Sequence, residues 1–253
     1  MEKDQQYALS KVPEVTLVFW LIKIAATTLG ETGGDAVSMS MNLGYLLSTG
    51  IFAVLFFIFV FVQIKAKKFH PFLYWATIIA TTTVGTTMAD FCDRSLHIGY
   101  AGGSSLLLIL LVASLSVWYW TMGSVSINTV SSPKTEMFYW VTIMFSQTLG
   151  TALGDWTADT EGFGYLNSTA LFVGLLVVIA SLYFFTKISR TALFWAAFVL
   201  TRPLGAVLGD FFDKPVANGG LNMSRYSASI ALVIFIIACI LIFKQRPAKS
   251  ASH

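Results

Sequence analysis

The chain has 253 residues, of which 56% are hydrophobic and only 11% are charged, and its mean hydropathy is +0.72. Because a soluble globular domain carries about 25% charged residues, this composition excludes an ordinary soluble protein and indicates an integral membrane protein. The formal net charge of +3 is small, and no nucleic-acid partner is expected.

Eight apolar runs follow the polar residues 1–14, and each is long enough to cross roughly 30 Å of hydrocarbon as a helix. Helices satisfy their own backbone hydrogen bonds in lipid, and the alternation typical of a β-barrel is absent. The sequence therefore predicts an all-α membrane protein with eight transmembrane helices and no cleavable signal peptide. The predicted spans are 15–35, 43–64, 72–91, 99–121, 136–156, 163–186, 192–211 and 226–243.

A segment that runs from a Trp to an Asp fifteen residues later occurs four times, at 20–35, 75–90, 140–155 and 195–210. Each copy has an aromatic residue before the Trp, a Gly five residues before the Asp and another Gly nine residues after it. These shared columns establish a fourfold internal repeat, and each repeat holds two predicted helices. We place the repeats at 15–64, 72–121, 136–186 and 192–243, within one transmembrane domain, 1–253. The motif aspartates are 55, 65 and 55 residues apart, which groups the repeats into two pairs, 1–125 and 126–253.

Basic residues collect on one predicted side of the membrane, while the other side holds only Arg94, Lys214 and Arg225. The positive-inside rule therefore predicts that both termini are cytoplasmic. A two-helix unit returns the chain to its starting side, so all four repeats should share one orientation. The bases on the cytoplasmic side are Lys3, Lys11, Lys65, Lys67, Lys68, Lys134, Lys187, Arg190, Lys244, Arg246 and Lys249.

The motif aspartates form the first candidate site. Fifteen residues of helix rise roughly 22 Å, so a Trp at the cytoplasmic interface would place each Asp near the outer edge of the hydrocarbon. Positions four, seven and eight residues before the Asp share its helix face. A polar stripe facing lipid is costly, so these faces should point into the bundle. The candidate ion-binding residues on them are Asp35, Asp90, Asp155, Asp210, Glu31, Thr28, Thr83 and Thr148.

Four carboxylates at one depth repel one another, so such a cluster either holds protons or binds a cation. Carboxylate and hydroxyl oxygens suit hard ions such as Mg²⁺, Mn²⁺ and Ca²⁺. We interpret Asp35, Asp90, Asp155 and Asp210 as candidate metal ligands. Capping and charge balance at the helix ends is the structural alternative for these four residues.

Small residues recur at positions five and one before each Asp, and they predict close helix packing. A sharper alternative is that they let the backbone bend or expose carbonyls to an ion, and Pro203 favours a local break in the fourth copy. The glycines concerned are Gly30, Gly34, Gly85, Gly150, Gly154, Gly205 and Gly209.

Two bases, Lys23 and Arg202, fall inside predicted spans. They either form internal salt bridges with the nearby acids or anchor an anion or zwitterion, for which Arg202 is the better donor. Both break the symmetry of the repeat, which favours a site between unlike repeats over a pore with four equivalent faces.

The motif tryptophans are predicted to lie at the cytoplasmic interface, where amphipathic rings are common. Trp118, Trp120 and Trp156 are likewise predicted as interface anchors. Cys92 and Cys239 lie in separate segments without a metal-binding or disulfide pattern. Because motifs of hydrolases, HExxH metalloproteases and phosphate-loop enzymes are also absent, we expect no cofactor and no enzymatic activity.

The four copies TLGETGGD, TVGTTMAD, TLGTALGD and the deviant PLGAVLGD share a T-x-G-x-x-x-G-D pattern. This pattern resembles a family of bacterial multi-spanning inner-membrane proteins described as uncharacterised membrane-anchored proteins. The resemblance covers nearly the whole chain and implies a bacterial cytoplasmic membrane location, but no activity.

Three functions remain open from the sequence. The first is a small transporter or exporter of a cation, a divalent metal or a proton-coupled ion, in which Asp155→Asn should abolish flux. The second is a carrier of an anion or small metabolite, anchored by Arg202 and Lys23, in which Arg202→Gln should abolish flux. The third is a non-transporting membrane scaffold, in which Gly150→Leu should be more harmful than any carboxylate change. The expected partners are the lipid bilayer and a small ion or molecule, and the sequence leaves the oligomeric state open.

Overall fold

The computed structural model describes residues 10–95, 99–160 and 163–248, and this part of the chain is all-α. Short 3-10 or π-helical turns connect several of the helices. The eight α-helices are α1 (Leu17–Asp35), α2 (Gly44–Lys65), α3 (Pro71–Asp90), α4 (Tyr100–Met122), α5 (Pro133–Asp159), α6 (Gly164–Phe185), α7 (Arg190–Asp213) and α8 (Arg225–Ile242).

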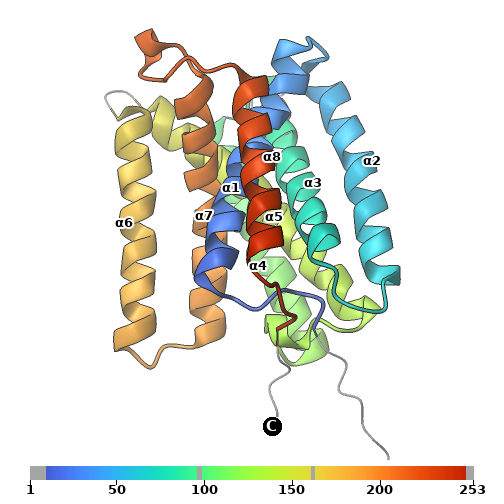
Figure 1. Cartoon of the computed structure of the whole chain (residues 1–253). Coiled ribbons are helices and arrows are strands. Elements are labelled where there is room, and N and C mark those ends of the chain that lie inside the picture. The colour runs from blue at the N-terminus through green and yellow to red at the C-terminus, as the bar shows by residue number, and fades with distance from the viewer. Residues whose placement is uncertain (1–9, 96–98, 161–162, 249–253) are drawn as a thin grey trace, which may run out of the picture.

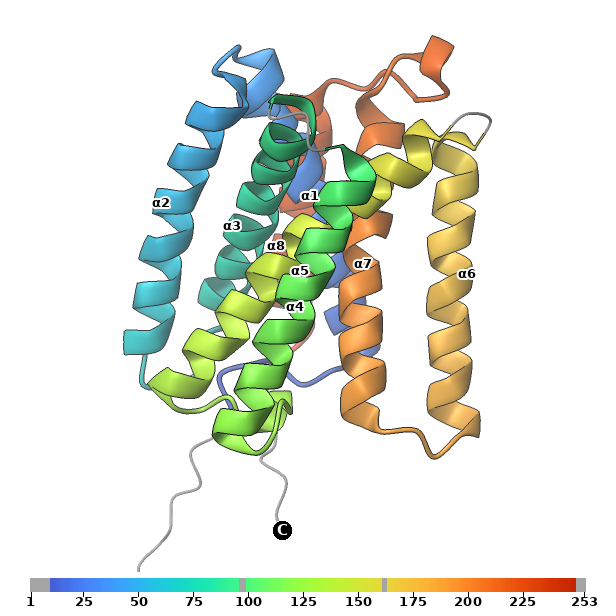
Figure 2. The same cartoon turned by 180° about the vertical axis from the view of Figure 1, so that it is seen from behind.

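The four motif helices α1, α3, α5 and α7 form a ring in which each contacts its two neighbours. The four plainer helices lie outside this ring (Figures 1 and 2). Each outer helix packs against the inner helix of the following repeat: α2 on α3, α4 on α5 and α6 on α7. The last outer helix, α8, packs on α1 and so closes the cycle. The four repeats are therefore arranged head to tail around one axis.

Glycines allow the inner helices to approach one another closely. A Cβ on Gly85 would lie 3.1 Å from the backbone of Gln147 on the next helix, and a Cβ on Gly209 would lie 2.6 Å from Cβ of Glu31. Gly30, Gly150 and Gly205 meet the next helix in the same way, and each faces the residue eight positions before the next motif Asp. A larger side chain at these glycines would separate the ring helices.

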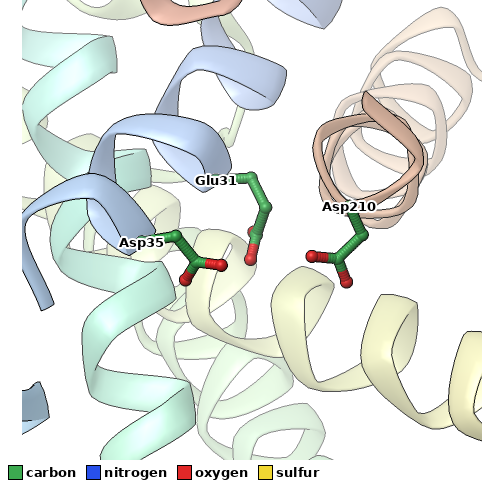
Figure 3. A group of neighbouring side chains, drawn as sticks. All are labelled: Glu31, Asp35 and Asp210. Carbon is green, nitrogen blue, oxygen red and sulfur yellow. The ribbon is translucent and has the colours of Figure 1, made fainter. Parts of the chain in front are cut away.

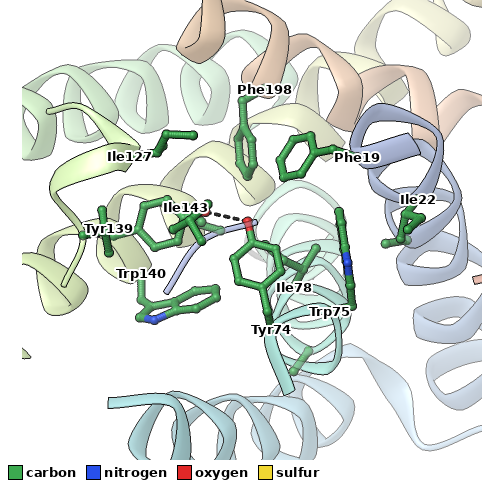
Figure 4. Close-up of a cluster of buried hydrophobic side chains, with 14 of the residues drawn as sticks. Phe19, Ile22, Tyr74, Trp75, Ile78, Ile127, Tyr139, Trp140, Ile143 and Phe198 are labelled. Atoms are coloured by element: carbon green, nitrogen blue, oxygen red, sulfur yellow. Dashed lines mark hydrogen bonds between the residues drawn. The ribbon is translucent and has the colours of Figure 1, made fainter. Parts of the chain in front are cut away.

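An aromatic layer closes one end of the ring (Figure 4). The aromatic residue before each motif Trp contacts the Trp of the next repeat, as in the pairs Phe19–Trp75 at 5.4 Å and Tyr74–Trp140 at 5.9 Å between ring centroids. The Tyr74 and Tyr139 hydroxyl groups are hydrogen-bonded at 2.6 Å inside this layer.

The prediction that these tryptophans anchor the bundle at its surface is wrong for most of them, because the protein itself encloses their rings. Trp75, Trp140 and Trp195 are buried, and Trp118 is buried as well. Ring closure explains the burial of the motif tryptophans, because an aromatic residue of the preceding repeat covers each of them. Trp118, on α4, instead packs against Tyr139 and Trp195. Trp120 and Trp156 are exposed on the outer surface of the bundle.

The inner and outer helices differ in hydropathy because they have different surroundings. Five helices, α2, α4, α6, α7 and α8, are long and apolar enough to cross a membrane. The other three, α1, α3 and α5, are ring helices with several buried threonines each, whereas the fourth ring helix, α7, has one, Thr201. A helix enclosed by other helices does not need an apolar surface, so its polar residues lower its hydropathy without facing lipid.

The loops at the two ends of the ring have different structures. Beyond the motif Asp, the chain turns into each outer helix through a glycine with positive φ, at Gly44, Gly99, Gly164 and Gly219. At the aromatic end, residues near both termini meet, because Val12 accepts a backbone hydrogen bond from Ala248. Lys3, Lys249 and part of the predicted repeats, 96–98 and 161–162, lie outside the described residues.

Candidate functional site

Residues four apart on each inner helix form a buried row, so the ring is built from stacked layers of four side chains. We call the layer of motif aspartates the carboxylate layer. Next toward the aromatic end come Glu31, Thr86, Thr151 and Ala206, and then Thr27, Thr82, Gln147 and Arg202. The following layer holds Lys23, Ile78, Ile143 and Phe198. The half of the axis next to the motif aspartates is thus polar. The opposite half ends in the aromatic layer.

Two bases divide the carboxylate layer into pairs. Arg94 lies 2.9 Å from Asp90 and 3.6 Å from Asp155, and it belongs to the π-helical turn Phe91–Ser95 that follows α3. Lys214 lies 2.9 Å from Asp210 and 3.2 Å from Asp35, and it follows α7 directly. Each base therefore joins the Asp four residues before it to the Asp of the next repeat.

Both bases stay charged in this setting. Burial alone would lower the pKa of the Lys214 ammonium, but the carboxylates of Asp210 and Asp35 raise that pKa above its usual value. The Arg94 pKa is raised in the same way by Asp90 and Asp155 against the opposing effect of burial. Deprotonation of these bases therefore does not release the aspartates near neutral pH.

Three carboxylates, from Glu31, Asp35 and Asp210, converge between α1 and α7 (Figure 3). Each offers one oxygen, and these oxygens all lie within 4.8 Å of one another. The three residues are buried, and Oδ1 of Asp35 has no hydrogen-bond partner among the described residues. We call these residues the carboxylate triad. Asp90 and Asp155 belong to the other pair, so the structure splits the four predicted metal ligands between two places.

Arg202 lies one layer below Glu31 and two layers below Asp35 and Asp210, and its side chain crosses the ring axis. Its Nη2 donates to Glu31 at 2.9 Å, to Thr86 at 2.6 Å and also to Thr151. One side chain from α7 thus contacts all three other inner helices, and none of its surface is exposed. Ala206, on the same helix, leaves the space that the guanidinium occupies.

Lys23 is fully buried but makes no ion pair within the described part of the chain. Its ammonium lies 4.2 Å from the centre of the Phe198 ring and 3.5 Å from Oε1 of Gln147. The expected salt bridge therefore forms at Arg202 and not at Lys23.

The predicted hydroxyl ligands Thr28, Thr83 and Thr148 lie outside the triad. Each hydroxyl donates to the carbonyl of the residue four positions earlier in its own helix, at 3.0, 2.7 and 3.0 Å. Threonine commonly bonds to its own helix in this way when no other acceptor is near. These residues make the helix surface polar without reaching the carboxylates.

The sequence placed Arg94, Lys214 and Arg225 only on the side opposite the predicted cytoplasmic one, yet all three contact motif acids. Arg225 lies 3.6 Å from Asp35 and also pairs with Asp213. The signal for the other two was present, since Arg94 and Lys214 each follow a motif Asp by four residues and lie 120 residues apart. That offset equals the offset between the two halves of the chain, from Asp90 to Asp210.

A cavity of about 720 Å³ lies away from these charges, between α1, α6 and α7. Its lining is mainly apolar and includes Trp20, Leu176 and Phe194. Because it opens on the outer surface of the ring and contains none of the triad residues, it is not the candidate ion site.

These features define a class: a helical protein of membrane type, built from four repeats that enclose a charged axis. The family described as "Repeat of Unknown Function (DUF347)" matches four segments of the chain, 18–69, 73–124, 138–189 and 193–246. The chain belongs to this family. No curated protein and no solved structure gives a significant match.

Proposed function

We propose that the protein is a multi-pass transporter or exporter of a hard divalent cation in the bacterial cytoplasmic membrane. The observation that carries this proposal is the convergence of three buried carboxylates, Glu31, Asp35 and Asp210, on one point. Carboxylate oxygens are the preferred ligands of Mg²⁺, Mn²⁺ and Ca²⁺. Acids buried inside a membrane bundle commonly mark ion pathways.

All eight helices cross the membrane in this proposal, with both termini cytoplasmic. Large apolar side chains cover the outer faces of α2, α4, α6 and α8, which suits contact with lipid. The ring helices α1, α3 and α5 have 19, 20 and 27 residues, enough for roughly 28 Å or more of helix. The excess of bases near the aromatic end supports a cytoplasmic position for that end.

The charge of the carboxylate layer supports a divalent substrate. Four motif aspartates, the bases Arg94 and Lys214, and the pair Arg225–Asp213 beside Asp35 leave the layer with a formal charge of −2. Glu31 is balanced separately by Arg202. One divalent cation would neutralise the layer, and neutralisation removes most of the cost of holding charge inside a low-dielectric bundle.

Lys214 occupies the place where a cation would bind, between Asp210 and Asp35. Its ammonium therefore acts as an internal competitor for the substrate ion. A bound metal would shift this ammonium off the two carboxylate oxygens, while Lys214 stays beside the layer and still counts in its charge, and return of the ammonium would release the metal. Such competition weakens the binding of the metal, so that the ion can dissociate from a strongly acidic site.

The test is uptake into proteoliposomes and cells over a panel of Mn²⁺, Mg²⁺, Ca²⁺ and anions, with deletion and overexpression strains for the growth arm. Asp210→Asn should abolish cation flux, whereas Asp159→Asn should not, because Asp159 is exposed and lies outside the triad. Flux of an anion that Arg202→Gln abolishes would favour the carrier anchored by Arg202 and Lys23. The absence of any flux in a correctly folded preparation would favour the scaffold.

A further inference from the structure

We infer that the ring axis contains a second site, which binds one small monovalent anion between Lys23 on α1, Gln147 on α5 and Arg202 on α7. This inference goes beyond cation transport and rests on different residues from the carboxylate triad. The anion class is that of chloride, nitrate or a short carboxylate.

The first argument is an excess of hydrogen-bond donors. Lys23, Gln147 and Arg202 have no exposed surface. Within the described residues, Nε2 of Gln147 and both Nε and Nη1 of Arg202 have no acceptor. The Lys23 ammonium carries three N–H groups, and among residues 10–95, 99–160 and 163–248 its one polar contact is the 3.5 Å approach to Gln147. Buried donors are nearly always paired in folded proteins, so this group requires an acceptor.

The second argument is charge. Arg202 is neutralised by Glu31 at 2.9 Å, while Lys23 has no acid partner in the described ranges of the chain. A lone ammonium in a low-dielectric interior is strongly unfavourable, so Lys23 keeps its charge only with a counter-ion beside it. One monovalent anion would balance it, whereas a dianion such as phosphate would leave an uncompensated negative charge.

The third argument is geometry. Thr151, in the layer of Glu31, connects two residues of the next layer. Its hydroxyl accepts a hydrogen bond from Arg202 and donates one to the carbonyl of Gln147 at 3.3 Å. Ile78, Ile143 and Phe198 occupy the register of Lys23 on the other three helices, and all are fully buried. Apolar walls around a few donors suit a weakly hydrated anion. Since only one repeat carries a Lys at this register, the ring has one such site and not four.

The experiment measures thermal unfolding of the purified full chain in detergent, at constant sodium concentration, with chloride, nitrate or acetate replacing gluconate. Gluconate is too large for the site and serves as the reference anion. At ten times its dissociation constant, a bound anion should raise the unfolding midpoint by about 3–6 °C. The rise should saturate, as expected for one site.

Lys23→Met is the decisive variant, because methionine keeps much of the side-chain volume and removes the charge. It should unfold in gluconate at the same temperature as the wild type or higher, which shows that it folds, and it should lose the anion response. Gln147→Leu should weaken the response at least threefold in dissociation constant. Lys187→Met, at an exposed lysine, should keep the full response.

An unsaturable salt effect, or a response that is equal in Lys23→Met and the wild type, would overturn the inference. Either result would leave cation transport intact, because the triad residues and the sodium concentration stay unchanged throughout. Conversely, loss of cation flux in Asp210→Asn says nothing against the anion site.

Discussion

The guanidinium of Arg202 lies 2.9 Å from the carboxylate of Glu31, and this contact joins the last repeat to the first. Both residues depart from the hydroxyls that most other copies carry at their positions. The ion pair therefore lies at the ring closure, where α7 meets α1, and it locks the most asymmetric part of the axis.

Breaking this pair on one side should strongly destabilise the fold. Arg202→Met or Glu31→Met alone leaves a buried charge without a partner, which costs about 3–5 kcal/mol. The double variant should recover most of this loss, since the Thr86 and Thr151 hydroxyls also bond to carbonyls of their own helices. Free energies of unfolding in detergent for the four proteins of this double-mutant cycle provide the check. If the double variant lost the sum of the free energies of unfolding lost by the two single variants, that result would contradict a stabilising ion pair between Arg202 and Glu31.

Removing the internal competitor should tighten cation binding. Lys214→Gln takes away the ammonium between Asp210 and Asp35, so the Mn²⁺ dissociation constant should fall by about tenfold or more, as expected for one less charge close to the site. The matched control is Arg94→Gln, which alters the other aspartate pair in the same layer and should have a smaller effect. Equal changes in both variants would argue against a site located at the triad. Isothermal titration of the purified proteins supplies the constants.

Glycines in the ring should be far less tolerant than glycines on the outer helices. A Cβ at Gly150 would collide with the Arg202 side chain, so Gly150→Ala should destabilise the protein by about 1–3 kcal/mol. Nothing lies within 4 Å of a Cβ at Gly174 on α6, where Gly174→Ala should be neutral or stabilising by up to about 1 kcal/mol. Unfolding curves in detergent distinguish the two. Similar losses at both positions would contradict the close packing of the inner helices.

Membrane orientation can be tested by labelling single cysteines in a chain without Cys92 and Cys239. Asn222 precedes α8 at the carboxylate end, and Lys187 lies between α6 and α7 at the aromatic end; both are exposed. An impermeant maleimide should label Asn222→Cys in intact cells and Lys187→Cys only after lysis. The reverse pattern would invert the proposed topology, and labelling of both in intact cells would contradict the crossing of α7, the helix between these two positions.

The sequence predicted the four repeats, the helical class and the approximate positions of the eight helices, because hydropathy and internal register are local properties. It also singled out Glu31 and Arg202, since charges within apolar runs are conspicuous. The ends of α5 and α7 extend beyond the predicted spans, to Asp159 and Asp213, because the helices continue through the residues after the motif Asp, which the apolar runs did not include.

The order of the ring could not be read from one repeat. A motif Trp resembles an interface anchor until the preceding repeat covers it, as Phe19 covers Trp75. The pairing of Lys214 with Asp35 joins residues 179 positions apart, and only closure of the ring brings them together. Contacts between repeats therefore determine which polar residues lie together at the carboxylate triad.

The most direct test of the cation site is a titration of the purified chain with Mn²⁺, in which electron paramagnetic resonance measures the bound ion. We predict one saturable Mn²⁺ per chain, lost in Asp35→Asn and Asp210→Asn and retained in the exposed variant Asp159→Asn. Absence of saturable binding in both the wild type and Lys214→Gln, or equal binding in all three Asp→Asn variants, would contradict the assignment of Glu31, Asp35 and Asp210 as the ligands.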